Sequence, residues 1–169
     1  MAESQVFKIL AIDDSPEIIS VIRSAVSSDY TLLAATSGVK GLEIARSQAV
    51  DMILLDVMMP EMDGFEVLAA LKQDAALQDV PVIFVTGKNS TGDEVHGLQM
   101  GAVDFVAKPI EPTILKARVN TQVRLAKANR QLETLNKQLE EEREAMLKFI
   151  ALTQKNARLA DEMTQQLSR

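Results

Sequence analysis

Carboxylates stand at the ends of two short apolar runs, and their types and placement suggest one acidic pocket. Asp56 closes the run 51–56, while Asp13 and Asp14 directly follow the run 6–12. If both runs are strands of the same parallel sheet, the three carboxylates meet at one edge of that sheet. Clustered carboxylates repel one another when ionised and therefore favour a cation, and hard oxygen ligands suit magnesium.

A hydroxyl and an ammonium group end two further apolar runs. Thr86 closes Val82 to Val85, and Lys108 follows the run 103–107. A carboxylate such as Asp56 can act as a nucleophile toward phosphorus and give an aspartyl phosphate. Phosphoryl transfer depends mainly on positioning and on neutralising the charge of the transferred group, so a metal, one lysine and one hydroxyl are sufficient. The set fits phosphoryl transfer to an aspartate.

The elements that must position these groups follow a βα repeat. Five apolar runs alternate with segments of helical periodicity, which predicts a parallel sheet covered by helices. The expected strands are 6–12, 31–35, 51–56, 81–86 and 103–106. The first expected helix begins near Pro16, the next three cover 38–46, 64–72 and 93–100, and the fifth begins near Pro112. In such sheets ligand sites gather at the carboxyl ends of the strands, where all five polar groups fall.

Composition excludes several classes of function. A net charge of -6 weighs against unspecific nucleic-acid binding by this chain. No cysteine is present, which removes disulfides and thiolate chemistry and agrees with a reducing compartment. No signal peptide and no apolar run of about 18 residues is found, so we expect a soluble, cytoplasmic protein without a membrane segment.

The C-terminal third predicts one long helix. No glycine or proline follows Pro112, so residues 113–169 are expected to be helical, with at most a single soft break, over roughly 85 Å. We place the domain boundary between 1–123 and a helical extension, 124–169. A three-four spacing of a heptad seam runs through Leu125, Ala128, Leu132, Leu135, Leu139, Glu142, Met146 and Phe149.

This seam favours a parallel homodimeric coiled coil. The alternative is that the seam packs back on its own domain, which the length of the helix makes difficult for the distal half. Beyond Phe149 it weakens to Thr153 and Asn156, while Leu152 and Leu159 offer a shifted phase, so the register stays open there.

Four segments together resemble the receiver domain of two-component response regulators. They are Asp13-Asp14, the stretch 56–64 (DVMMPEMDG), Thr86-Gly87 and the stretch 101–109 (GAVDFVAKP). The resemblance covers about residues 5–123. It implies a flavodoxin-like, doubly wound (βα)5 fold with strand order 2-1-3-4-5, here followed by the extended helix, and a histidine kinase or phosphotransfer protein as partner.

The resemblance also implies roles for the polar groups. Asp56 would be the phosphoacceptor and a magnesium ligand, Asp14 a direct ligand, and Asp13 a ligand through water. The backbone carbonyl of Met58 would complete the protein ligands. Lys108 would pair with the phosphoryl group and precede a cis peptide bond to proline.

Two residues would form the family's switch. Thr86 would hydrogen-bond a phosphoryl oxygen, and Phe105 would turn inward as it does so. Lys88 and Met58 flank the site at positions where the family tunes the lifetime of the phosphorylated state.

Three functions remain open. The first is a receiver that signals through its coiled coil and is no enzyme beyond assisting its own phosphorylation and dephosphorylation. The second is a coiled-coil adaptor with minor or no phosphorylation control. The third is a magnesium-dependent phosphatase, which Met58 disfavours because such enzymes commonly carry a second aspartate there. About 45 residues after 124 are too few for a separate output domain, so either the helix is the output or an effector follows Arg169.

Overall fold

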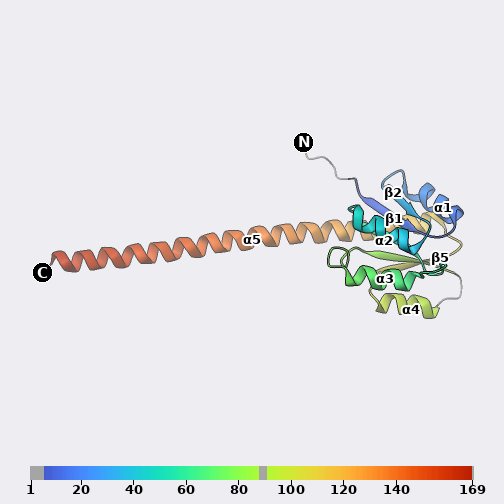
Figure 1. Ribbon diagram of the computed structural model, residues 1–169. Coiled ribbons are helices and arrows are strands. Elements are labelled where there is room, and N and C mark those ends of the chain that lie inside the picture. The colour runs from blue at the N-terminus through green and yellow to red at the C-terminus, as the bar shows by residue number, and fades with distance from the viewer. Residues whose placement is uncertain (1–5, 88–90, 169) are drawn as a thin grey trace. The chain divides into compact units, whose positions relative to one another are not determined.

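Strands and helices alternate along the chain, as expected (Figure 1). The computed structural model describes residues 6–87 and 91–168. Its strands are β1 (Lys8–Ile12), β2 (Thr31–Ala35), β3 (Met52–Asp56), β4 (Val82–Thr86) and β5 (Asp104–Ala107). Its helices are α1 (Pro16–Val26), α2 (Gly38–Ser47), α3 (Gly64–Gln73), α4 (Thr91–Gln99) and α5 (Pro112–Leu167).

The five strands form one parallel sheet in the order β2-β1-β3-β4-β5. This confirms the predicted doubly wound fold. All five residues of β3 and of β4 are buried, as expected of central strands that helices cover on both faces. Because every strand runs the same way, β1, β3, β4 and β5 all present their carboxyl ends at one edge of the sheet.

A glycine lets helix α4 pack closely against strand β4. A Cβ on Gly97 of α4 would lie 2.6 Å from the ring of Phe84 on β4. The same ring makes an edge-to-face contact with Phe65 of α3, with 5.4 Å between centroids. His96 is exposed on α4 and its ring contacts Phe65.

Helix ends follow local capping chemistry. The side chain of Ser15 caps α1, with Pro16 in the first turn, and Asp63 and Glu66 form a capping box at the start of α3. Helix α4 covers Thr91–Gln99, whereas the sequence predicted 93–100. It ends earlier because Gly101 adopts a left-handed φ of 104°, and the bond from the Ala102 amide to the Gly97 carbonyl closes the last turn.

Helix α5 is continuous over 56 residues, without the soft break that the sequence allowed. The chain divides into two compact units, residues 1–125 and 126–169. Within the first unit α5 buries Leu115, Val119 and Val123. Among the described helices none is both long enough and apolar enough to cross a lipid bilayer.

The contact between Gly97 and Phe84 predicts a difference between two glycines of α4. Gly97→Ala should destabilise the fold by roughly 1–3 kcal/mol, because the added methyl group overpacks the aromatic ring. Gly92→Ala is the matched control: a Cβ there meets nothing within 4 Å, and alanine favours the helix by up to about 1 kcal/mol. Urea unfolding followed by the fluorescence of Tyr30 measures both, and equal midpoints would contradict the packing argument.

Candidate functional site

Three carboxylates meet at the carboxyl ends of β1 and β3. One oxygen from each of Asp13, Asp14 and Asp56 lies within 4.8 Å of the others. Asp13 and Asp56 are 1% and 4% exposed, while Asp14 is exposed to solvent. The structure therefore brings together the three carboxylates that the sequence placed in one pocket.

Lys108 bridges the two buried carboxylates. Its Nζ lies 3.0 Å from Asp13 Oδ2 and 3.1 Å from Asp56 Oδ1. Its backbone amide donates to the carbonyl of Thr86 at 2.6 Å, which ties the loop after β5 to the end of β4. The following Lys108–Pro109 peptide bond is cis, as predicted. The lysine is thus held against the acidic cluster at both its backbone and its side chain.

Burial and neighbouring charge oppose ionisation of Asp56. Burial raises the pKa of this carboxyl above its ordinary value, and the nearby charge of Asp13 raises it further. Lys108 and the Met58 amide, which donates to Asp56 Oδ1 at 3.4 Å, lower the pKa only in part. Burial would lower the pKa of Lys108, but its bonds with Asp13 and Asp56 outweigh that effect and raise the pKa.

The charges of the cluster are suited to a divalent cation. Three ionised carboxylates and one ammonium group leave a formal charge of -2. Asp13 Oδ2 is buried and accepts no hydrogen bond, although it pairs electrostatically with Lys108. Hard carboxylate oxygens with spare acceptor capacity are the donor set that magnesium prefers. The residues therefore fit the metal that the resemblance implies.

Thr86 contributes a buried hydroxyl without a partner. Thr86 is 1% exposed, and its Oγ1 makes no hydrogen bond. Buried polar groups are rarely left unpaired, so a donor in this state at the mouth of an acidic pocket calls for an explanation. An acceptor that arrives at the strand ends would provide one.

Phe105 on β5 is half-buried, and a cation from α5 lies against it. The guanidinium carbon of Arg118 stands 5.8 Å from the ring centroid. Nη1 of Arg118 also donates to both carboxylate oxygens of Asp104, at 2.9 and 2.8 Å. Sequence reasoning missed this clasp, because the two residues lie 14 positions apart and no motif links them.

The loop after Asp56 is held close to the strand by a glycine. The amide of Gly64 donates to the carbonyl of Val57 at 2.9 Å, and a Cβ on Gly64 would collide with the Asp56 carbonyl. Met58 in this loop is 75% exposed. Its predicted carbonyl contact with a metal stays a prediction, and Lys88 lies outside the described residues.

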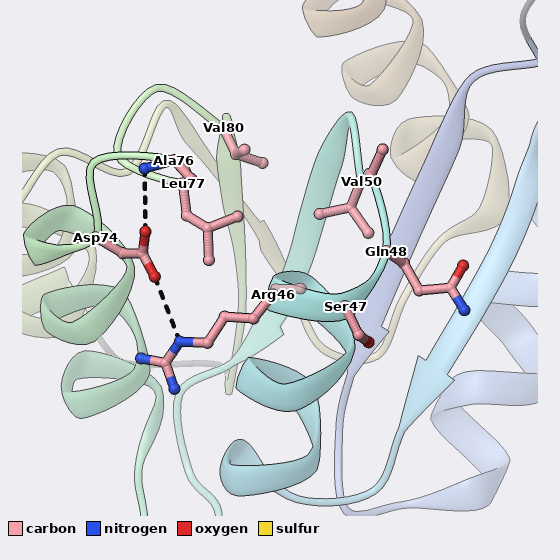
Figure 2. A pocket seen from close by; sticks show the side chains of 10 residues that line it. Arg46, Ser47, Gln48, Val50, Asp74, Ala76, Leu77 and Val80 are labelled. Atoms are coloured by element: carbon pink, nitrogen blue, oxygen red, sulfur yellow. Dashed lines mark hydrogen bonds and ion pairs between the residues drawn. The ribbon is translucent and has the colours of Figure 1, made fainter.

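A separate hollow of about 590 Å3 lies at the opposite edge of the sheet (Figure 2). It is lined by the end of α2 and by the segment that leads into β4, near the amino ends of β3 and β4. Arg46 and Asp74 form an ion pair across it at 3.3 Å, and the Ala76 amide donates to Asp74. Its polar groups bond to one another far from the strands' carboxyl ends, so we assign it no part in the phosphoryl chemistry.

Comparison with known proteins agrees with this geometry. The family model for the response regulator receiver domain matches residues 9–120, and the chain belongs to that family. A Vibrio cholerae protein named "Probable cyclic di-GMP phosphodiesterase" is 40% identical over 134 residues, which cover 79% of this chain and 30% of that protein. The response regulator PleD of Caulobacter vibrioides is 38% identical over 118 residues, which cover 69% of this chain and 26% of PleD.

Solved structures show the same fold. The chemotaxis protein CheY4 of Vibrio cholerae matches with a TM-score of 0.65 and 28% identity, over 69% of this chain and 98% of that one. The chain spans less than a third of the length of the two curated relatives named above. Receiver domains accept phosphoryl groups in two-component signalling, interact with histidine kinases or phosphotransfer proteins, bind Mg2+ at an acidic pocket, and are generally not enzymes.

The raised pKa of Asp56 predicts that the parent and the variant Asp56→Asn differ in stability by an amount that depends on pH. The folded state disfavours the ionised carboxyl, so this group's contribution to stability is present below its ordinary pKa of 3.8 and is lost as pH rises through the raised folded value. Asp56→Asn removes the ionisation. In magnesium-free buffer at pH 7 the variant should therefore unfold at higher urea than the parent.

The stabilisation by Asp56→Asn should shrink as the pH is lowered toward 3.8. Asp79→Asn, at an exposed site away from the cluster, controls for net charge and should show no such trend. An Asp56→Asn variant that is less stable than the parent at pH 7 would contradict the prediction.

Proposed function

We propose that the chain accepts a phosphoryl group on Asp56 from a histidine kinase or phosphotransfer protein and signals through its C-terminal helix as a coiled coil. The observation that supports this most directly is the joint placement of a buried carboxylate, a lysine and an unpartnered hydroxyl at one sheet edge. Asp56 is the nucleophile. Lys108 pairs with the negative charge of the transferred phosphoryl group, and the hydroxyl of Thr86 donates a hydrogen bond to it.

The transfer proceeds by in-line displacement. A carboxylate oxygen of Asp56 attacks phosphorus on the donor's phosphohistidine, the new P–O bond forms as the P–N bond breaks, and the imidazole leaves with the electron pair and takes up a proton. Lys108 compensates the charge on the phosphoryl oxygens. The chain assists this reaction and the later hydrolysis at Asp56 and catalyses nothing else.

Magnesium is the proposed cofactor. Asp13, Asp14, Asp56 and the carbonyl of Met58 would hold it, with Asp13 acting through water. When bound, the ion supplies positive charge that stabilises the phosphoryl group and keeps Asp56 ionised at neutral pH, which the raised pKa otherwise opposes. The formal charge of -2 on the cluster supports this assignment.

The signal leaves the site through Thr86 and Phe105. When the hydroxyl of Thr86 bonds a phosphoryl oxygen, the end of β4 shifts and Phe105 turns inward. Arg118 would transmit that movement to α5, because its guanidinium group binds Asp104 and also lies against the ring of Phe105. This clasp gives the switch a physical connection to the helix that continues to Leu167.

The helix beyond residue 125 is proposed to pair with a second copy of itself. Leu132, Leu135 and Leu139 are between 52% and 57% exposed, although they stand at seam spacing. A parallel pair would bury this stripe. In that arrangement Glu142 at a d position faces Glu142 of the second copy, and Arg143 at the neighbouring e position of each chain compensates these like charges.

Phosphorylation gives a direct test of the site. With Mg2+ and phosphoramidate, the intact mass should rise by one phosphoryl group, and Asp56→Asn should abolish the increase. Lys108→Ala and Asp14→Ala should slow labelling by roughly a hundredfold, the usual effect of removing one electrostatic stabiliser. Asp79→Asn is the control and should label normally. Labelling of Asp56→Asn at the parent rate would rule out the assignment.

Oligomeric state tests the coiled coil separately. Sedimentation equilibrium should give twice the chain mass, and Leu139→Glu should raise the dissociation constant at least about a hundredfold, because each of two leucines loses roughly 1.5 kcal/mol of burial. Thr134→Glu adds the same charge on the outer face and should leave the dimer intact. A parent chain that is monomeric with and without a phosphoryl mimic would refute the dimer.

A further inference from the structure

The distal part of α5 carries an exposed apolar stripe that divides in two. Up to Phe149 a single seam alternates steps of three and four residues, with Leu139 and Met146 at a positions and Glu142 and Phe149 at d positions. Met146 and Phe149 are 59% and 67% exposed. Beyond Phe149 two continuations are possible, and they involve different side chains.

The first continuation, the continuous seam, keeps the same alternation and runs through Thr153, Asn156, Ala160, Met163 and Leu167. The second, the shifted seam, takes one extra step of three at Phe149 and runs through Leu152, Asn156, Leu159 and Met163. The seams share Phe149, Asn156 and Met163, which occupy d positions in the continuous seam and a positions in the shifted seam.

Opposing physical effects act on the two seams. The shifted seam buries Leu152 and Leu159 where the continuous seam would bury a threonine and an alanine, and both leucines are about half-exposed in the single chain. It also moves Asn156 to an a position, where one asparagine specifies register in a two-stranded parallel coiled coil. Its extra step of three overwinds the helices locally, a strain that the continuous seam avoids.

We propose that residues 149–167 pair with the same segment of a second copy in two alternative ways, through the continuous or the shifted seam, and that the state of the receiver domain biases the choice. This inference rests on the homodimer of the proposed function. The occupant is a parallel second copy because Asn156 then opposes Asn156 in both seams and their amides can bond, while Glu142 and Arg143 are matched just upstream.

A continuous helix can carry such a bias. Helix α5 runs from Pro112 to Leu167 with no glycine or proline after its first residue, so a rotation imposed near Arg118 has no flexible break along the way in which to dissipate. Changing seams requires only a small rotation of each distal helix about its own axis, since three seam positions are retained. The coiled coil therefore needs no dissociation to change state.

Single cysteines can report which seam forms, because the chain has none of its own. Leu152→Cys crosslinks through the shifted seam and Thr153→Cys through the continuous seam. Each full-length variant is equilibrated in a glutathione redox buffer, with and without Mg2+ and beryllofluoride as the phosphoryl mimic. Both variants should crosslink, and the mimic should change the ratio of their dimer fractions by about fivefold or more, the usual range of coupling between sites.

A second pair of cysteine variants tests whether the substitutions themselves change the pairing. Leu159→Cys and Ala160→Cys should shift in the same direction as Leu152→Cys and Thr153→Cys. Gln154→Cys points away from both seams, so its sulfur atoms lie too far apart to bridge and it should form few disulfides. Leu139→Cys, in the shared part of the seam, reports the dimer alone.

The outcomes separate the inference from the proposed function. If Leu139→Cys forms no disulfide, the homodimer fails and the two-seam pairing fails with it. If Leu139→Cys crosslinks but only one seam does so, or the ratio is the same with and without beryllofluoride, the dimer stands and the two-seam inference is overturned.

Discussion

The contact of one ammonium group with two buried carboxylates is the interaction on which the site depends. Lys108 lies within 3.1 Å of both Asp13 and Asp56, yet it compensates only one of three negative charges in the cluster. Burial is the main cause of the raised pKa of Asp56, and the uncompensated negative charge raises that pKa further. The same excess of negative charge suits the cluster to a divalent cation. A neutral pocket of the same shape would lack this affinity for a divalent cation.

Sheet topology makes that contact possible. Asp13 follows β1, Asp56 ends β3 and Lys108 follows β5, so groups 95 positions apart meet because these parallel strands end on the same side of the sheet. The backbone bond from Lys108 to the Thr86 carbonyl then fixes the lysine's distance from β4. The fold thus holds the carboxylates, which repel one another, and the ammonium group of Lys108, which attracts them, at short range.

Sequence patterns predicted the strands and the gathering of the five polar groups, because apolar runs and the residues that end them are local signals, whereas the strand order came from the resemblance to receiver domains. Two features were beyond their reach. The sequence placed the Lys108 ammonium near the carboxylates but did not show that it bridges Asp13 and Asp56, since pairing between loops depends on side-chain reach rather than on spacing. The need for glycine at position 64 is the second feature, because only the approach of the Asp56 carbonyl shows why no side chain fits there.

The two parts of the chain follow different rules, and this bears on how a signal could pass between them. In the receiver domain burial selects one arrangement, since β3 and β4 are wholly covered and any slip in register would disrupt the packing on both faces of the sheet. In the distal helix no residue is buried within the single chain from 126 to 168, so pairing alone must choose its apolar seam. A phosphoryl group can bias a surface with two nearly equal pairings far more easily than it can deform a packed sheet, because a bias of a few kcal/mol moves such an equilibrium from one side to the other.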